Sequence, residues 1–264
     1  MDILSDSLRP TLTLLSKSLP DLAPARKLRI PPVRHLVREL DYPDRSLPGD
    51  LIRGMPIVGT TPSTSSLPMK ETTATMSTHD VLGEVRCANS KVLKSLSKPT
   101  LEVPKQKCWG LSQRGYEMGW LSEPTPVAAT DLDTAILSPR FCTSERHGIQ
   151  ERKFRLIDDL AKSNVNKTVQ TSETYCRQGI DSFLALTRPH RANGATDLEQ
   201  RSFDFTHAYK AISLGTSSSE AAKIYFINPV DNRPYKSKIT ALPFGIRRAP
   251  ANWGRVVSSS SFRP

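Results

Sequence analysis

Strand-like and helix-like patterns alternate in the second half of the chain, and this alternation limits the fold more than any other feature of the sequence. The predicted strands are 153–158, 202–205, 223–228 and 235–242, and the predicted helices are 172–186 and 251–257. In the first helix, Ser172 can cap the N-terminus, and Cys176 and Ile180 begin an apolar stripe at helical spacing. The turn-rich PVDNR segment between the last two strands predicts an antiparallel hairpin. We therefore expect an α+β fold and exclude a helical bundle.

The N-terminal third of the chain, in contrast, shows no regular alternation of strand and helix patterns. Its short apolar patches are interrupted by many prolines, and residues 60–78 are rich in serine and threonine. Hydrophobic residues make up 37% of the chain and aromatic residues 6%, so we expect the ordered core to be smaller than the whole chain. We interpret residues 1–79 as a variable, mostly irregular and largely disordered region, with 60–78 as a linker.

The remaining residues divide into three parts. Residues 80–150 are predicted to be mainly helical, with helices at 81–96 and 110–124, the second ending at Pro124. Residues 151–255 hold the alternating strands and helices, and residues 256–264 are predicted to be an irregular tail. No internal repeat is visible.

Charge and cysteine spacing limit the classes of function. The formal net charge is +11, which favours polyanionic partners, nucleic acid first. The four cysteines, Cys87, Cys108, Cys142 and Cys176, are widely spaced and contain no zinc or redox motif. We expect a reduced, intracellular protein, with no secretory signal and no membrane-spanning segment. The sequence does not distinguish the nucleus from the cytoplasm and predicts no oligomeric state.

Three segments, in order, carry the chemical signal. They are RKFRLIDDLAKSNVN (152–166), DFTHAYKAISLG (204–215) and ITALPFGIRRAPANWGR (239–255). Together they resemble the reverse transcriptases of retroelements, whose palm carries an LPFG turn. The approach segments GYEMGWLSEP (115–124) and 136–159 are also similar to that family, so the resemblance covers about residues 80–255. It implies the fingers and first half of the palm of a right-hand polymerase.

The resemblance implies a metal site for nucleotidyl transfer. Two divalent cations about 4 Å apart stabilise the attacking and leaving oxygens in such a reaction, and Mg²⁺ prefers oxygen ligands. By the resemblance, the carboxylate of Asp204 and the backbone carbonyl of Phe205 bind magnesium, with Asp204 as the catalytic residue. Tyr209 would lie under the incoming sugar and select against a 2′-hydroxyl. The alternatives are a structural carboxylate at a strand end for Asp204 and a core tyrosine for Tyr209.

The resemblance also implies contacts with the incoming nucleotide and with nucleic acid. The nucleotide-binding residues besides Tyr209 would be Lys153, Arg155, Phe244 and Gly245. Glycine at position 245 allows close approach of the backbone. The phosphate-binding residues would be Arg247 and Arg248, which lead into a helix. For all four cations, a solvated surface position is an equally good interpretation.

Two positions in the first segment are ambiguous. The fingers aspartate of the family matches Asp159, although the neighbouring Asp158 also fits, and we expect a structural or primer-side role for it. The trailing asparagine of the family matches either Asn164 or Asn166.

The family has a second palm hairpin with an aromatic-x-Asp-Asp motif after the LPFG turn, and residues 256–264 hold no such motif. We therefore expect a chain truncated after the LPFG segment that does not polymerise alone. The expected partners are an RNA or DNA primer–template and a deoxynucleoside triphosphate. Two hypotheses follow: a fragment of an RNA-directed DNA polymerase, or a non-catalytic basic module that binds nucleic acid.

Overall fold

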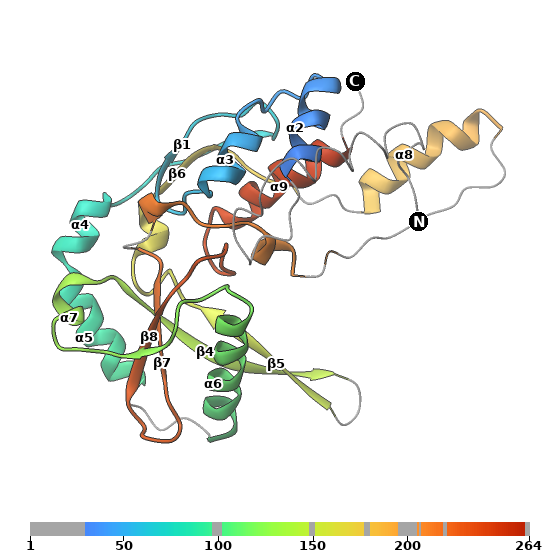
Figure 1. The fold of residues 1–264 in the computed structure, drawn as a ribbon. Helices are drawn as coiled ribbons and strands as arrows, with labels where there is room; N and C mark the ends of the chain where they lie inside the picture. The colour runs from blue at the N-terminus through green and yellow to red at the C-terminus, as the bar shows by residue number, and fades with distance from the viewer. Residues whose placement is uncertain are drawn as a thin grey trace.

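The computed structural model describes residues 30–96, 102–147, 151–176, 180–194, 205, 207–218 and 221–261. Helices α2, α3 and α9 lie together at one end of the molecule, and the larger sheet lies at the other (Figure 1). The helices are α2 Ile30–Glu39, α3 Leu47–Arg53, α4 Thr78–Gly83, α5 Val85–Leu96, α6 Glu102–Glu117, α7 Asp131–Thr134, α8 Ile180–Ala192 and α9 Ala249–Ser261. Three short 3₁₀ helices are η1 Val165–Thr168, η2 Ala208–Ala211 and η3 Thr216–Ser218. The strands are β1 Gly59–Thr61, β2 Met69–Thr72, β3 Thr125–Pro126, β4 Leu137–His147, β5 Glu151–Asp158, β6 Val169–Glu173, β7 Lys223–Ile227 and β8 Pro234–Lys238.

The larger sheet has five strands in the order β3-β8-β7-β4-β5. Strands β7 and β8 form the antiparallel hairpin that the sequence predicts. Strand β4 lies parallel to β7 and then pairs antiparallel with β5 as a long hairpin. The mixture of helices with mixed sheets confirms the α+β class.

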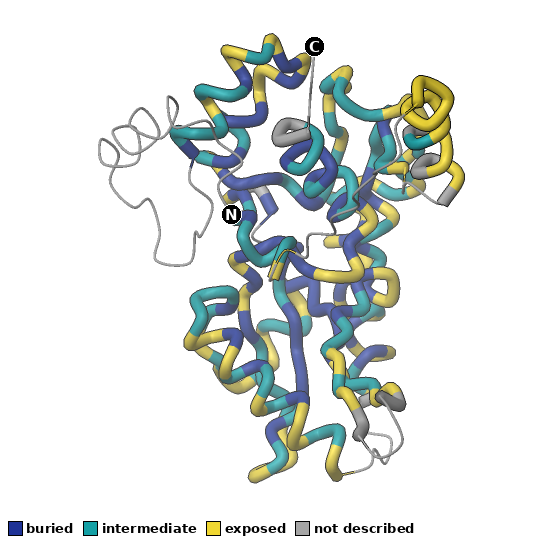
Figure 2. The backbone as a smooth tube through the Cα atoms, turned by 90° about the vertical axis from the view of Figure 1, so that its right-hand side faces the viewer, coloured by how far each residue is buried: buried dark blue, intermediate teal, exposed yellow. Residues whose placement is uncertain are grey.

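Both faces of this sheet are covered by helices. On β7, Phe226 packs against Trp109 of α6, with ring centroids 5.6 Å apart. The neighbouring Tyr225 points to the other face, where it packs with Val92 of α5 and Leu137. Successive side chains of a strand point to opposite faces of the sheet. Because a helix covers each face, both Phe226 and Tyr225 are fully buried. Buried backbone runs through the middle of the molecule, and exposed backbone lies on the outer turns (Figure 2).

The prediction of an irregular region over residues 1–79 is wrong for the described part, residues 30–79. This part contains α2, α3, β1, β2 and the start of α4. The apolar patches between the prolines are buried in the main core through Tyr42, Leu47, Leu51, Met55 and Ile57. Proline is compatible with α3 because Pro48 lies in the first helical turn, where its missing N–H has no intrahelical partner. Residues 1–29 lie outside the described residues.

An ion-pair network joins this N-terminal segment to α9. The Arg255 guanidinium donates to Asp44 at 2.6 Å and 3.2 Å and to Asp50 at 2.6 Å. Arg255 and Asp44 are both buried. A buried charge is tolerated only when it is paired and hydrogen-bonded, so these contacts join segments more than 200 positions apart.

The predicted linker over 60–78 forms part of a second sheet. This sheet has the order β1-β6-β2, with β1 parallel and β2 antiparallel to β6. The buried carboxylate of Glu173 accepts hydrogen bonds from the Ser63 hydroxyl, the Thr64 hydroxyl and amide, and the Ser65 amide. The small polar side chains are therefore ordered by one buried acceptor that lies far away in the sequence.

The same pairing overturns the start of the helix predicted over 172–186, whereas residues 180–186 of that prediction do lie in a helix. Residues 169–173 form β6, so Ser172 lies in a strand and not at a helix cap. The described helix, α8, begins at Ile180 and projects from the rest of the structure (Figure 1). The apolar stripe from Ile180 onward does lie in a helix. The helix start was placed wrongly because strands β1 and β2, which pair with β6, come from the segment predicted to be a linker.

The other local predictions have mixed outcomes. The predicted strand 153–158 is the end of β5. The helix predicted over 251–257 is α9, which continues to Ser261, so the prediction of an irregular tail from residue 256 is wrong for the described residues 256–261. The helix predicted over 81–96 is two helices, and the helix predicted from residue 110 begins at Glu102. The 80–150 region is not only helical, because it contains β4, whose partner β5 follows it in the chain. The predicted strand 202–205 lies outside the described residues apart from Phe205. Within the described ranges, no helix is both long and apolar enough to cross a membrane.

Candidate functional site

The turn of the third segment packs directly on the end of strand β5. Gly245 in this turn has a φ of +92°. A Cβ atom at this position would lie 2.3 Å from the backbone oxygen of Asp158, closer than real Cβ contacts allow. The position therefore requires glycine for two independent reasons, its backbone conformation and the approach of another backbone. The first and third segments meet here.

Asn166 holds the turn from the other side. Its side-chain amide donates to the backbone oxygen of Gly245, and its side-chain oxygen accepts the amide of Arg247, both at 2.9 Å. Asn164, in contrast, occupies the left-handed backbone conformation before η1 and makes no capping hydrogen bond with its side chain. Of the two asparagines that the sequence left open, Asn166 is the one that contacts the LPFG turn.

The two neighbouring aspartates have different roles. Asp158 is buried and forms a bidentate ion pair with Arg140, with Nε–Oδ1 at 2.6 Å and Nη2–Oδ2 at 2.9 Å. Asp159 is partly exposed, and its Oδ1 accepts the backbone amide of Lys162 at 3.0 Å. In the described structure, both carboxylates have local structural partners.

Four aromatic side chains form a row beside the turn. Tyr209 lies 4.9 Å from Phe244 and 6.3 Å from Trp253, and Trp253 lies 5.4 Å from Phe205, measured between ring centroids. Phe205 and Phe244, at the ends of the row, are 53% and 52% exposed. Three of the predicted site residues, Phe205, Tyr209 and Phe244, are thus close together. Trp253 was not predicted, because its sequence context indicates only an amphipathic helix.

The predicted metal site is not described in full. Asp204, the predicted carboxylate ligand, lies outside the described residues. The Phe205 carbonyl accepts the amide of Ala208 at 3.2 Å. Within the described ranges, no group of three or more His, Cys, Asp and Glu side chains could hold a metal ion. The described residues alone therefore do not form the carboxylate set that Mg²⁺ requires.

Lys210, next to Tyr209, is a residue that the sequence analysis missed. Its ammonium group lies 6.0 Å from the centroid of the Phe244 ring. Desolvation by burial lowers the pKa of Lys210 to about 8, although the carboxylate of Asp158 acts in the opposite direction. Lys210 is therefore close enough to Asp158 for the carboxylate charge to favour the protonated amine.

The predicted fingers cations lie elsewhere. Lys153 and Arg155 are exposed on β5, opposite Glu145 and Thr143 of β4. The Arg155 Nε forms an ion pair with Glu145 at 2.7 Å. Among the described residues, no hydrogen bond, ion pair or ring contact joins either cation to Tyr209 or Phe244.

The two arginines after the turn separate into one exposed and one buried residue. Arg247 is exposed, as a phosphate contact requires. Arg248 is only 1% exposed, so the prediction that it binds nucleic acid is wrong for this structure. Its guanidinium donates to the backbone oxygens of Val58 at 3.2 Å, and of Pro56 and Gln170 at 3.5 Å. Burial lowers the pKa of Arg248 to about 10, and the nearby charge of Arg255 adds to the effect.

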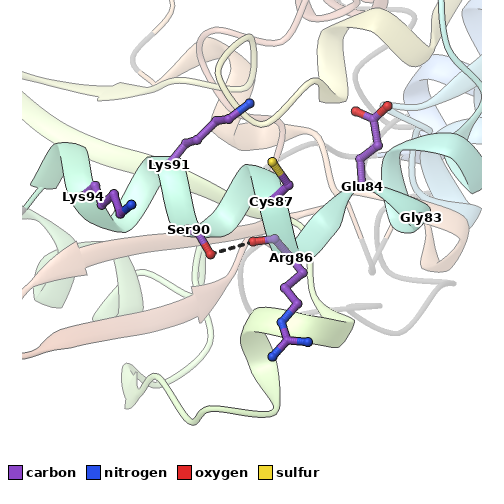
Figure 3. A pocket seen from close by; sticks show the side chains of 7 residues that line it. All are labelled: Gly83, Glu84, Arg86, Cys87, Ser90, Lys91 and Lys94. Atoms are coloured by element: carbon purple, nitrogen blue, oxygen red, sulfur yellow. Dashed lines mark hydrogen bonds between the residues drawn. The ribbon is translucent and has the colours of Figure 1, made fainter.

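A second basic surface lies on α5, away from this turn. Arg86, Lys91 and Lys94 project from the helix around a shallow hollow of about 570 Å³, with Cys87 and Glu84 beside them (Figure 3). Arg86 also pairs with Asp133 at 3.1 Å. This surface adds local positive charge that composition alone could not place.

The chain matches no protein-family model and no curated protein.

Proposed function

We propose that the chain carries the fingers and the first half of the palm of an RNA-directed DNA polymerase of the retroelement type. The supporting observation is the convergence of the three segments that carry the resemblance. Gly245 packs on Asp158, Asn166 bonds to the same turn, and Tyr209 contacts Phe244. The resemblance implies that these three segments form one site, and the contacts agree with that expectation.

In this proposal, the residues act on a primer end and an incoming deoxynucleoside triphosphate. Asp204 and the Phe205 carbonyl are the magnesium ligands, and magnesium would supply charge stabilisation on the transferred phosphoryl group. Tyr209 packs under the sugar and excludes the 2′-hydroxyl. Phe244 and Gly245 form the floor beside the nascent base pair. Lys153 and Arg155 are the triphosphate contacts. This requires the Arg155–Glu145 ion pair to open and the β4–β5 hairpin to move towards Tyr209 and Phe244, which neither cation contacts in the described structure.

Nucleotide selection is the most direct test of the site. With a fluorescent primer–template, we expect a deoxynucleoside triphosphate and magnesium to strengthen binding, and a ribonucleoside triphosphate to do so less. Tyr209→Ala should reduce this discrimination while leaving primer–template binding intact. Tyr235→Ala is a matched control, because Tyr235 packs on Trp109 of α6 and not beside the turn. Equal discrimination in both variants would contradict the assignment.

Primer extension tests the metal site. The 264-residue chain should show no extension on an RNA template with magnesium or manganese, because Asp204 is the only carboxylate that the resemblance assigns to the metals. A chimera that adds a second palm hairpin and thumb of the family after residue 255 should extend the primer. Asp204→Ala in the chimera should abolish extension. Extension by the unmodified chain that survives Asp204→Ala would refute the site.

The second candidate function is a non-catalytic basic module that binds nucleic acid. The net charge of +11, the exposed Arg247 and the basic surface on α5 favour it. Both candidates predict salt-sensitive binding that tolerates many sequences. Binding that responds to neither magnesium nor nucleoside triphosphate would favour the module over the polymerase fragment.

A further inference from the structure

Two cysteines from separate parts of the chain line one small cavity. Cys108 lies on α6 and Cys142 on β4, and both line a cavity of about 50 Å³ between these elements. Pro104, Lys105 and Phe141 complete part of its wall. The cysteines are 34 positions apart in sequence (142 − 108), so only the packing of α6 on the hairpin brings them to the same cavity.

The packing of α6 on β4 explains why the two sulfurs share this space. The thiol of Cys108 points to the backbone oxygen of Arg140 at 3.8 Å. One helical turn later, Ser112 Oγ accepts from the Arg140 guanidinium at 3.3 Å. Side chains two apart on a strand share a face, so Cys142 and Arg140 both point towards α6. Cys142 accordingly packs against the main core and lines the cavity beside Cys108.

The two thiols differ in accessibility. Cys108 is 5% exposed, whereas Cys142 is half-buried and accessible from outside. Lys107 is exposed near Cys142, and its charge favours the thiolate of Cys142, although burial still raises the pKa of that thiol. Lys105 lines the same cavity. Of the two thiols, Cys142 is therefore the one that a reagent can reach, and the charges of Lys105 and Lys107 beside it would attract a small anionic reagent.

We propose that Cys108 and Cys142 are a modification site, which forms an intramolecular disulfide by exchange with a small anionic disulfide of the glutathione class. The Cys142 thiolate attacks one sulfur of the small disulfide, forms a mixed disulfide and releases one small thiolate. The Cys108 thiol then loses its proton to water and attacks the Cys142 sulfur, releasing the second small thiolate. Two protein thiols are oxidised and one small disulfide is reduced to two thiols.

The modification would join α6 covalently to the β4–β5 hairpin. Burial raises the pKa of Cys108 to about 12, so its thiolate is scarce at neutral pH and the second step is slow. Formation of the disulfide is therefore slow at neutral pH and becomes faster as the pH rises. This inference does not depend on the proposed polymerase function, because it rests on the packing of α6 against β4 alone.

Thiol mapping tests the proposal. In a Cys87→Ser, Cys176→Ser background, Cys108 and Cys142 are the two cysteines left, since the chain has four. After incubation with oxidised glutathione and blocking with N-ethylmaleimide, peptide mass analysis should show the 108–142 linkage in a monomeric chain. A glutathione adduct on Cys142 should appear first and decay, because the attack by Cys108 is the slow step; at the end of a long incubation both thiols should be gone and no glutathione should be retained. Adding Cys142→Ser should leave Cys108 fully reactive to N-ethylmaleimide after denaturation.

The parent chain supplies a positive control for the reagent. Its Cys87 and Cys176 are exposed, and Cys87 lies open on α5 (Figure 3), so both should take up glutathione readily. Three results would each overturn the proposal. They are a stable glutathione adduct on Cys142 with Cys108 still free, a linkage between chains, and two unmodified thiols under conditions that modify Cys87.

Discussion

Replacing Gly245 by alanine tests how tightly the LPFG turn packs on strand β5. The change adds one Cβ atom, 2.3 Å from the Asp158 backbone oxygen, at a residue with φ of +92°. The backbone conformation costs an L-residue about 1–2 kcal/mol. Relief of an overpacked contact costs about 1–3 kcal/mol more. We expect Gly245→Ala to lower the free energy of unfolding by about 2–5 kcal/mol.

Two matched glycines separate these contributions. Gly59 has φ of +75° with nothing within 4 Å of an added Cβ, so Gly59→Ala should show the conformational cost of about 1–2 kcal/mol alone. Gly110, inside α6, also has nothing within 4 Å and no positive φ. Gly110→Ala should stabilise the protein by about 0.5–1 kcal/mol through helix propensity.

The assay is urea unfolding followed by far-ultraviolet circular dichroism. With a slope of about 3 kcal/mol/M, a loss of 3 kcal/mol lowers the midpoint by about 1 M. The urea midpoint should be highest for Gly110→Ala, followed by the parent chain and Gly59→Ala, and lowest for Gly245→Ala. If Gly245→Ala costs no more than Gly59→Ala, the turn does not pack on Asp158 as the structure has it, and the main support for the proposed function is lost.

Three further predictions concern charged residues. Asp158→Ala leaves the buried Arg140 without its carboxylate and should cost about 3–5 kcal/mol in urea unfolding, whereas replacing both residues by apolar ones should cost less. Arg247→Ala should reduce the slope of log Kd for nucleic acid against log salt by about one with little change in stability, while Arg248→Ala should lower stability and leave that slope unchanged. Burial raises the pKa of Glu173, but the hydrogen bonds from Thr64 and Ser63 outweigh this and hold the pKa below the ordinary value of 4.5. The contribution of Glu173 is therefore complete above pH 4.5 and is lost as the pH falls through the lowered pKa, so Glu173→Gln should remove this part of the acid sensitivity; an unchanged acid profile would contradict it.

The local sequence pattern was sufficient to predict those elements whose formation depends on residues close together in the chain. The β7–β8 hairpin, the end of β5 and the helix after Pro250 all follow from residues within a few positions of one another. The clustering of Phe205, Tyr209 and Phe244 is not local in this sense: these residues come from two distant segments, and only the family resemblance placed them at one site. Arg247 and Arg248 could not be separated in this way, because adjacent positions before a helix point to opposite sides and only the packing partner decides which is buried.

The sequence by itself determined the α+β class and the basic charge. The resemblance supplied three of the residues beside the LPFG turn, Phe205, Tyr209 and Phe244, but not Trp253 or Lys210. Only the tertiary structure decided the fate of segments whose partners are distant. Residues 169–173 became a strand because β1 and β2 pair with them, so the predicted helix start at Ser172 was wrong, although the apolar stripe from Ile180 onward lies in α8. The Ser/Thr-rich segment became ordered because Glu173, about 110 positions away, supplied a buried acceptor. Hydrogen bonds and burial between distant residues offset an entropy cost that local composition alone predicts to be too large.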